Sequence, residues 1–140
     1  MISTIAVGTD GSATADEAVK EATALARSLG AKLVLLSAFQ DSKGSRTGTE
    51  DPELQWATSS SARVKTILER IEAQVGQSGI ECETCVDEGD PADVLIRLAD
   101  ECEADLLVIG NQGMKRRVLG SVPNTVTHKA ACSVLVVKTT

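Results

Sequence analysis

The sequence predicts a doubly wound α/β domain with a five-stranded parallel sheet and helices on both faces. Two observations favour this class. Short apolar runs alternate with longer segments in which apolar residues recur every three or four positions, the pattern of strands alternating with helices. The run at residues 33–36 is continuously apolar, which is typical of a strand covered on both faces. No internal repeat or linker is apparent, so we expect residues 1–140 to form a single domain.

The first strand is expected at residues 4–7, followed by a polar turn at residues 8–12. Ser12 is a residue type that caps helices, because its hydroxyl oxygen accepts a hydrogen bond from a backbone N–H of the first turn. A stripe of alanine, valine and leucine then runs to Leu29, and Gly30 is the expected C-terminal cap. The second strand, residues 33–36, follows directly.

Residues 40–52 are mostly polar, and we expect them to form a surface loop without a helix of its own. The next helix is predicted at residues 53–75, where an apolar stripe ends at Val75. Residues 80–87 alternate between polar and apolar side chains. The third strand is therefore expected to lie half exposed at an edge of the sheet.

Asp90 and Pro91 predict the start of the third helix, because Asp is a favoured N-cap and proline is tolerated at the first helical position. The last elements are a strand at 105–109, a helix at 121–130 and a strand at 132–138. This strict alternation, with right-handed crossovers, places helices on both faces of the sheet.

The composition excludes several classes of function. The net charge of −6 repels nucleic acid and anionic membranes. Aromatic residues make up only 1% of the chain, so it lacks a stacking platform for single-stranded nucleic acid. No apolar run approaches the roughly 18 residues of a membrane span, and the N-terminus lacks a signal-peptide pattern. We expect a cytoplasmic protein that binds neither nucleic acid nor membrane.

Cys82 and Cys85 form a CxxC pattern, but residues three apart on a strand point to opposite faces. Zinc would need four ligands, and the other cysteines and His128 are predicted on other elements. We therefore expect structural cysteines and no metal site built from them. The sequence has no nucleophile elbow and no residue that stands out as a general base. We expect no catalytic residue, and at most very slow turnover.

Ligands of doubly wound sheets bind outside the carboxyl ends of the strands, where the strand order reverses. Two strand ends carry loops with glycines and polar groups, residues 8–12 and residues 110–121. The other strand ends lack comparable loops. We therefore expect the first and fourth strands to be neighbours at the reversal, with one ligand between their loops. This gives the strand order 3-2-1-4-5.

The loop after the fourth strand has the chemistry of an anion site. Gly110 and Gly113 allow close approach of the backbone, and the following helix presents unpaired N–H groups at its positive end. Ser121 adds a hydroxyl, and Lys115 begins a run of three cations. In the first loop, Asp10 suits hydroxyl or amino groups of a nucleoside, or a divalent cation bound to phosphate. The structural alternative is a tight turn, an N-cap at Ser121 and a solvated basic face.

These residues resemble the universal stress protein family over essentially the whole chain. The resemblance rests on the segments IAVGTDGS, EGDPADVL, DLLVIGNQG, LGSVPNTV and CSVLVVK. It implies the Usp fold, which is adenine nucleotide alpha hydrolase-like, with the 3-2-1-4-5 sheet. It further implies a role in stress response, a homodimer through the last strand, residues 132–138, and in many members ATP binding. Pairing with a second copy would also protect this apolar edge.

The resemblance places Gly8 and Asp10 near adenine and ribose, and the backbone of Ala38 against adenine. The second loop would line the ribose and phosphates. Magnesium or manganese would accompany the nucleotide through Asp10. The complete candidate set is Gly8, Thr9, Asp10, Ala38, Gly110, Asn111, Gly113, Met114, Lys115, Gly120, Ser121 and Val122.

Family members that bind ATP carry Gly-x2-Gly-x9-Gly-Ser/Thr, whereas six residues separate Gly113 from Gly120 here. ATP is the first expectation, and AMP or cyclic AMP is the alternative that suits a shorter loop. A nucleotide-independent dimer that acts through protein interactions is the second hypothesis. An ATPase or phosphotransferase is the least favoured.

Overall fold

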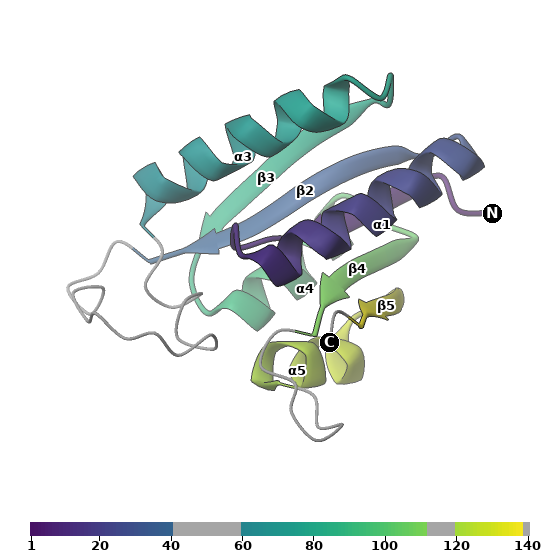
Figure 1. Ribbon diagram of the computed structural model, residues 1–140. Coiled ribbons are helices and arrows are strands. Elements are labelled where there is room, and N and C mark those ends of the chain that lie inside the picture. Colours follow the sequence, from purple (N-terminus) through teal and green to yellow (C-terminus); the bar gives the residue numbers. More distant parts are fainter. Residues whose placement is uncertain (41–59, 112–119, 139–140) are drawn as a thin grey trace.

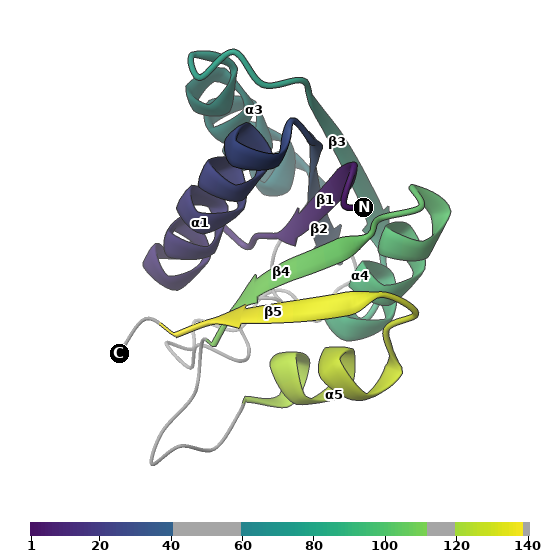
Figure 2. The same cartoon turned by 90° about the vertical axis from the view of Figure 1, so that its right-hand side faces the viewer.

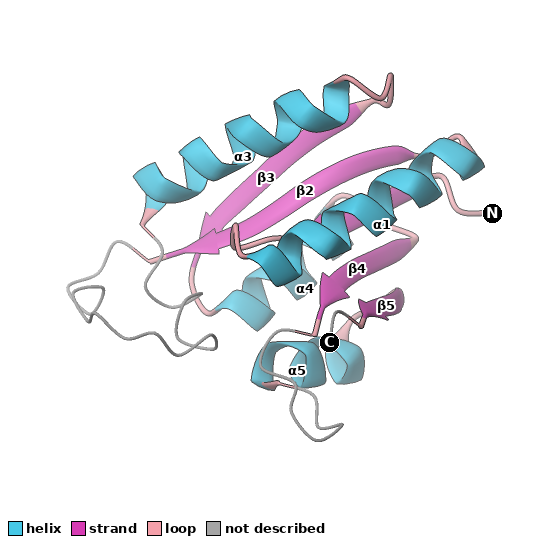
Figure 3. Cartoon of the chain, in the orientation of Figure 1, coloured by secondary structure: helices cyan, strands magenta, loops and turns pink. Residues whose placement is uncertain are grey.

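The computed structural model describes residues 1–40, 60–111 and 120–138 (Figure 1). Strands and helices alternate along these residues (Figure 3). They are β1 (Thr4–Gly8), α1 (Ala13–Leu29), β2 (Lys32–Phe39), α3 (Ser61–Gly76), β3 (Cys82–Glu88), α4 (Pro91–Glu101), β4 (Leu106–Gly110), α5 (Ser121–Lys129) and β5 (Ser133–Val137). Residues 41–52 of the expected loop and residues 53–59 of the expected helix lie outside the described residues. Gly113, Met114 and Lys115 also lie outside them.

The five strands form one parallel sheet in the order β3-β2-β1-β4-β5, as predicted. β1 lies in the middle, where Val7 pairs with Leu35 of β2 on one side and Val108 of β4 on the other. The chain builds outward from β1 through β2 to β3, then crosses to the other side of β1 for β4 and β5. The carboxyl ends of β1 and β4 therefore form the reversal point at which such sheets bind ligands.

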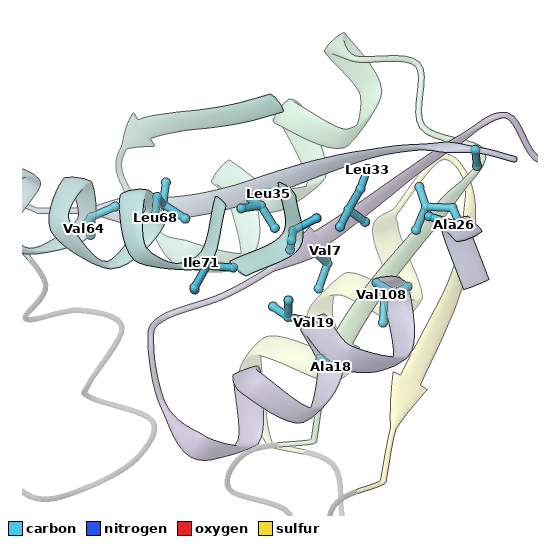
Figure 4. Packing of buried hydrophobic residues seen from close by; sticks show 14 residues of the cluster. Val7, Ala18, Val19, Ala26, Leu33, Leu35, Val64, Leu68, Ile71 and Val108 are labelled. Carbon is cyan, nitrogen blue, oxygen red and sulfur yellow. The ribbon is translucent and has the colours of Figure 1, made fainter. Parts of the chain in front are cut away.

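Two aliphatic cores sandwich the sheet. Helices α1 and α3 cover one face, and α4 and α5 cover the other (Figure 2). Figure 4 shows Val19 of α1 and Ile71 of α3 packing against the sheet with Val7 and Leu35. The neighbouring residue Ala6 enters the opposite core, because successive strand residues point to opposite faces. Both faces of the central strands are buried, which explains their continuous apolar runs.

Caps set the ends of the helices largely as the sequence predicts. The Ser12 hydroxyl accepts from the Ala15 N–H at 3.1 Å, and the Asp90 carboxylate accepts from the Asp93 N–H at 3.2 Å. Gly30 takes a left-handed conformation with φ 66° at the end of α1, which favours glycine.

The predicted second helix is not continuous from residue 53 to residue 75. Ser60 has an extended backbone and caps α3, because its hydroxyl accepts from the Arg63 N–H at 3.2 Å. A continuous helix through residue 60 is therefore interrupted, and α3 begins at Ser61. The predicted apolar stripe is correct in the described helix, where Val64, Leu68, Ile71 and Val75 are buried.

β3 is an edge strand, as the alternating sequence predicted, and its two cysteines face opposite sides of the sheet. Cys82 packs against the α1–α3 core and Cys85 against the α4–α5 core. Burial, with help from Glu72 and Glu83, raises the pKa of the Cys82 thiol to about 11. That thiol stays protonated at neutral pH, unlike a reactive cysteine. No helix in the described ranges is long and apolar enough to cross a membrane.

Candidate functional site

The loop between β1 and α1 is fixed to the end of β2 by backbone and side-chain hydrogen bonds. The N–H of Thr9 donates to the Leu36 carbonyl at 2.9 Å, and the Ser37 hydroxyl donates to the Thr9 carbonyl at 2.6 Å. The Thr9 hydroxyl in turn accepts from the Gly11 N–H at 3.1 Å. Thr9 is fully buried, so it holds the loop in place from within. This arrangement fixes the position of Asp10, the next residue.

Asp10 carries a buried carboxylate whose two oxygens lie in different environments. The residue is 2% exposed, and its Oδ1 accepts from the Ser12 N–H at 2.9 Å. Its Oδ2 is buried and has no hydrogen-bond partner among the described residues. Burial raises the pKa of this carboxyl, while the hydrogen bonds to Ser12 and the charge of Arg63 oppose the rise. A buried acceptor without a partner is unusual in folded proteins, and a ligand donor would satisfy it.

The end of β4 packs directly against the start of α1. A Cβ atom on Gly110 would lie 2.7 Å from Thr14 Cγ2 and 2.9 Å from the Thr14 carbonyl oxygen. A Cβ on Gly8 would lie 2.9 Å from Leu95 Cδ1 of α4. Both glycines therefore have a packing role that the sequence interpretation did not assign to them. The contact at Gly110 also places the end of β4 beside the start of α1.

Ala38 and Asn111 lie at the ends of strands near the same edge. Ala38 is fully buried, and its side chain packs in the α4–α5 core, so only its backbone can face a ligand. Asn111 is 3% exposed, and its N–H donates to the Val137 carbonyl at 3.2 Å. This bond ties the end of β4 to β5. The binding roles predicted for both residues remain predictions.

Ser121 does not cap α5, although an N-cap was the structural alternative to its binding role. Gly120, with an extended backbone, is the N-cap, and it makes no side-chain capping bond. Ser121 is the first helical residue and is exposed, so it is not the N-cap. Val122 packs partly against the α4–α5 core. Figures 1 and 2 show α5 beginning at the end of the sheet where β4 ends. The positive end of this helix therefore lies on the side of the sheet that carries Asp10.

Helix α3 also contributes to the site, which the sequence interpretation missed. A Cβ on Gly11 would lie 2.7 Å from Ile67 Cδ1, so this side chain covers the turn after Asp10. Arg63, one turn earlier, is a nearby positive charge that opposes the rise in the pKa of Asp10 caused by burial. The available signal was the apolar stripe of the helix, which contains Ile67. It did not indicate which loop the start of the helix would cover.

The family model of the universal stress protein family matches residues 1–138. The chain belongs to the universal stress protein family. Universal stress protein Rv1636 of Mycobacterium tuberculosis is 36% identical over an aligned length of 144 residues, covering 98% of this chain and 97% of that protein.

Structures of other family members are also similar. The crystal structure of a universal stress protein in complex with cAMP has a TM-score of 0.78 and 32% identity, and covers 99% of each chain. The structure of the Archaeoglobus fulgidus universal stress protein in complex with dAMP has a TM-score of 0.71 and 26% identity. That match covers 97% of this chain and 98% of the other. The family assignment made from the sequence is therefore confirmed.

We predict that Asp10→Asn stabilises the ligand-free protein by roughly 1 kcal/mol at pH 7, because it removes an incompletely paired buried charge. The pKa of Asp10 is raised in the folded state, so its ionisation destabilises the fold as pH rises above about 4. The stabilisation by Asp10→Asn should therefore shrink as pH falls toward 4. Thermal denaturation as a function of pH measures it.

Asp105 is the matched control. It lies just before β4 and bonds to the start of β1, at the opposite end of these strands from Asp10. Its Oδ2 accepts from the N–H groups of Ser3 at 2.9 Å and Thr4 at 3.0 Å, and these bonds lower its pKa. Asp105→Asn should destabilise the protein at neutral pH, and its effect should shrink as pH falls below about 4. Effects of the same sign for the two variants would contradict the environments described for these carboxylates.

We also predict that Gly110→Ala destabilises the fold by about 1–3 kcal/mol, because the new methyl group meets the backbone of Thr14. Gly76→Ala is the control, since a Cβ there meets no atom within 4 Å. At the end of α3 this change should raise stability by up to about 1 kcal/mol. Chemical denaturation measures both. Equal stability of Gly110→Ala and the unmodified protein would show that the glycine is not required for packing.

Proposed function

We propose that this universal stress protein binds an adenine nucleotide between the β1–α1 loop and the end of β4. The observation that carries this proposal is the buried Asp10 carboxylate at the reversal point of the sheet, whose Oδ2 lacks a partner among the described residues. Such an oxygen can accept hydrogen bonds from the hydroxyl and amino groups of a nucleoside. The start of α5 offers positive partial charge for a phosphate on the same side of the sheet.

The nucleotide class is supported by the similar structures, which hold cAMP and dAMP. Both ligands carry one phosphate. The six-residue spacing between Gly113 and Gly120 also suits a smaller group than a triphosphate. We therefore place cyclic AMP and AMP ahead of ATP, which was the first expectation from the family motif.

A divalent cation would reach this site only with the nucleotide. Asp10 offers a single carboxylate oxygen, because its Oδ1 already accepts from the Ser12 N–H. Mg²⁺ or Mn²⁺ would then take its other ligands from phosphate oxygens and water. A nucleotide with one phosphate binds through the helix start and Asp10 without that cation.

We infer a binding and regulatory module rather than an enzyme, acting in the stress response in the cytoplasm. His128, the single histidine of the sequence, lies exposed in the last turn of α5, away from the start of that helix. Asp10 is held by Ser12 and serves ligand positioning. Turnover of ATP by the purified protein, lost in Asp10→Ala, would contradict this part of the proposal.

Nucleotide binding is tested by calorimetry with cyclic AMP, AMP and ATP, and GMP is the control for recognition of the base. We expect saturable binding of an adenine nucleotide and about tenfold weaker binding by Asp10→Asn, because an amide offers one acceptor where the carboxylate offers two. Asp105→Asn, on the opposite end of the sheet, should keep full affinity. No binding of any adenine nucleotide at millimolar concentration would refute the proposal and favour a nucleotide-independent dimer.

We further propose that two copies associate through β5. The bond from the Asn111 N–H to the Val137 carbonyl shows that the odd-numbered residues of β5 pair with β4. The backbone amides of Val134 and Val136 therefore point to the outer edge of β5. β5 has no charged residue, and Leu135 is 36% exposed. Antiparallel pairing of two such edges about a two-fold axis would satisfy the amides and bury the apolar side chains.

Leu135→Lys should weaken the dimer at least tenfold, because it loses apolar burial and places like charges near the two-fold axis. Sedimentation equilibrium measures the dissociation constant. Val86→Lys is the matched control, an exposed valine on the opposite edge strand, and it should leave association unchanged. A monomer at all concentrations, or loss of the dimer in the control alone, would contradict association through β5.

A further inference from the structure

The opposite edge of the sheet, β3, combines an exposed apolar side chain with a groove. Val86 is 44% exposed, although it is a valine on a regular strand. Helix α3 runs alongside β3 (Figure 1), and a groove of about 550 Å³ lies between them. Phe39, Leu68, Thr84 and Val86 line it, together with charged side chains of α3. Helix α3 borders both this groove and the candidate nucleotide site, but no described residue that lines the groove belongs to the candidate nucleotide-site set.

The backbone of β3 presents a regular row of hydrogen-bonding groups to the open edge. Two hydrogen bonds show which residues of β3 face β2. The Leu33 N–H donates to the Glu81 carbonyl at 2.9 Å, and the Gly89 N–H donates to the Phe39 carbonyl at 3.1 Å. Odd-numbered residues of β3 therefore pair with β2. The even-numbered residues Thr84 and Val86 direct their N–H and C=O groups outward. No strand among the described residues pairs with them.

The same even-numbered residues point their side chains into the groove. Cys82 packs in the α1–α3 core, and Thr84 and Val86 line the groove on that face. A strand added to this edge would therefore form a backbone ladder and place every second side chain between β3 and α3. This is the geometry of β-strand addition, in which main-chain bonds give affinity and a groove selects alternate side chains.

The charges around the edge indicate the chemistry of the occupant. β3 carries Glu83, Asp87 and Glu88 and no cation. Glu69 and Glu72 line the groove from α3, and Lys65 is the one cation among the described residues that line it. Glu83 pairs with Lys32 and Asp87 with Arg97, whereas Glu69, Glu72 and Glu88 form no ion pair within the described residues.

This charge pattern separates two possible occupants. A second copy of this acidic chain would bring glutamates of β3 against glutamates of the other β3, which repel. A basic strand would meet opposite charges. The edge is thus protected against copies of itself and open to a cationic partner.

We propose that the β3 edge and its groove bind an extended segment of a partner protein, in which basic residues alternate with apolar ones, as a sixth strand of the sheet. The apolar side chains occupy the groove beside Val86 and Leu68. The basic side chains lie on the other face, beside Glu83 and Asp87, and they would share these carboxylates with Lys32 and Arg97. This inference does not depend on nucleotide binding.

The test uses a fluorescent, end-blocked peptide, Lys-Val-Lys-Val-Lys-Val-Lys, and the full-length protein. Fluorescence anisotropy should show saturable binding that weakens with salt, and at least tenfold weaker binding of Glu-Val-Glu-Val-Glu-Val-Glu. Two further peptides carry N-methyl groups on either the valine or the lysine amides. Only alternate amides of the bound peptide face β3, so methylation at one of the two residue types should weaken binding at least tenfold and methylation at the other should not. The residue type that is sensitive shows whether the peptide runs parallel or antiparallel to β3.

Protein variants locate the binding to β3. Thr84→Pro removes an outward N–H while leaving the ladder to β2, and should weaken peptide binding at least tenfold. Thr84→Val keeps that N–H and should bind within about threefold of the unmodified protein. Thermal denaturation confirms that each variant is folded. Val86→Lys should also weaken binding, whereas Leu135→Lys on the opposite edge should not.

Three outcomes would overturn the proposal. The full chain fails to bind the lysine peptide, or both N-methylated peptides bind equally well. Alternatively, the protein self-associates and Val86→Lys abolishes this association, which would assign the edge to a second copy.

Discussion

The pairing of β1 between β2 and β4 is the constraint on which the site depends. It places the chain reversal at the carboxyl end of β1, and the end of β4 at Gly110 packs there against Thr14 at the start of α1. Thr9, bonded to the end of β2, holds Asp10 in a buried position with one oxygen unsatisfied among the described residues. A half-satisfied buried carboxylate costs stability in the free protein. Such local costs concentrate where a ligand supplies the missing interaction, which is the basis of the nucleotide proposal.

The two edge strands of the sheet, β5 and β3, differ in the kind of strand that could pair with their outward-facing backbone groups. β5 is uncharged and apolar, which favours pairing with an identical strand. β3 is acidic and borders a groove, which disfavours an identical strand and favours a basic one. A single sheet thus offers one edge suited to self-association and one suited to a different partner, while the proposed nucleotide site lies at its carboxyl end. Nucleotide and partner binding are therefore compatible in space.

The sequence predicted the strand order, the caps at Ser12 and Asp90, the edge position of β3 and the opposed cysteines. These features follow from local periodicity and from the rules of parallel sheets. It mislocated the start of α3, because three consecutive serines at 59–61 give no periodic signal and the cap is recognised only from the bond of Ser60 to Arg63. The packing roles of Gly8 and Gly110 and the cover by Ile67 depend on contacts between distant elements. The sequence interpretation therefore did not reveal them.

The most direct test of the account is the ionisation of Asp10 itself. The pKa of its carboxyl can be measured by ¹³C NMR in the free protein and in the presence of saturating cyclic AMP or AMP. We expect a pKa above the usual value of about 4 in the free protein, and a lower pKa in the complex, because ligand donors stabilise the ionised form. A normal pKa in the free protein, or a raised pKa that bound nucleotide leaves unchanged, would contradict the central role of this carboxylate.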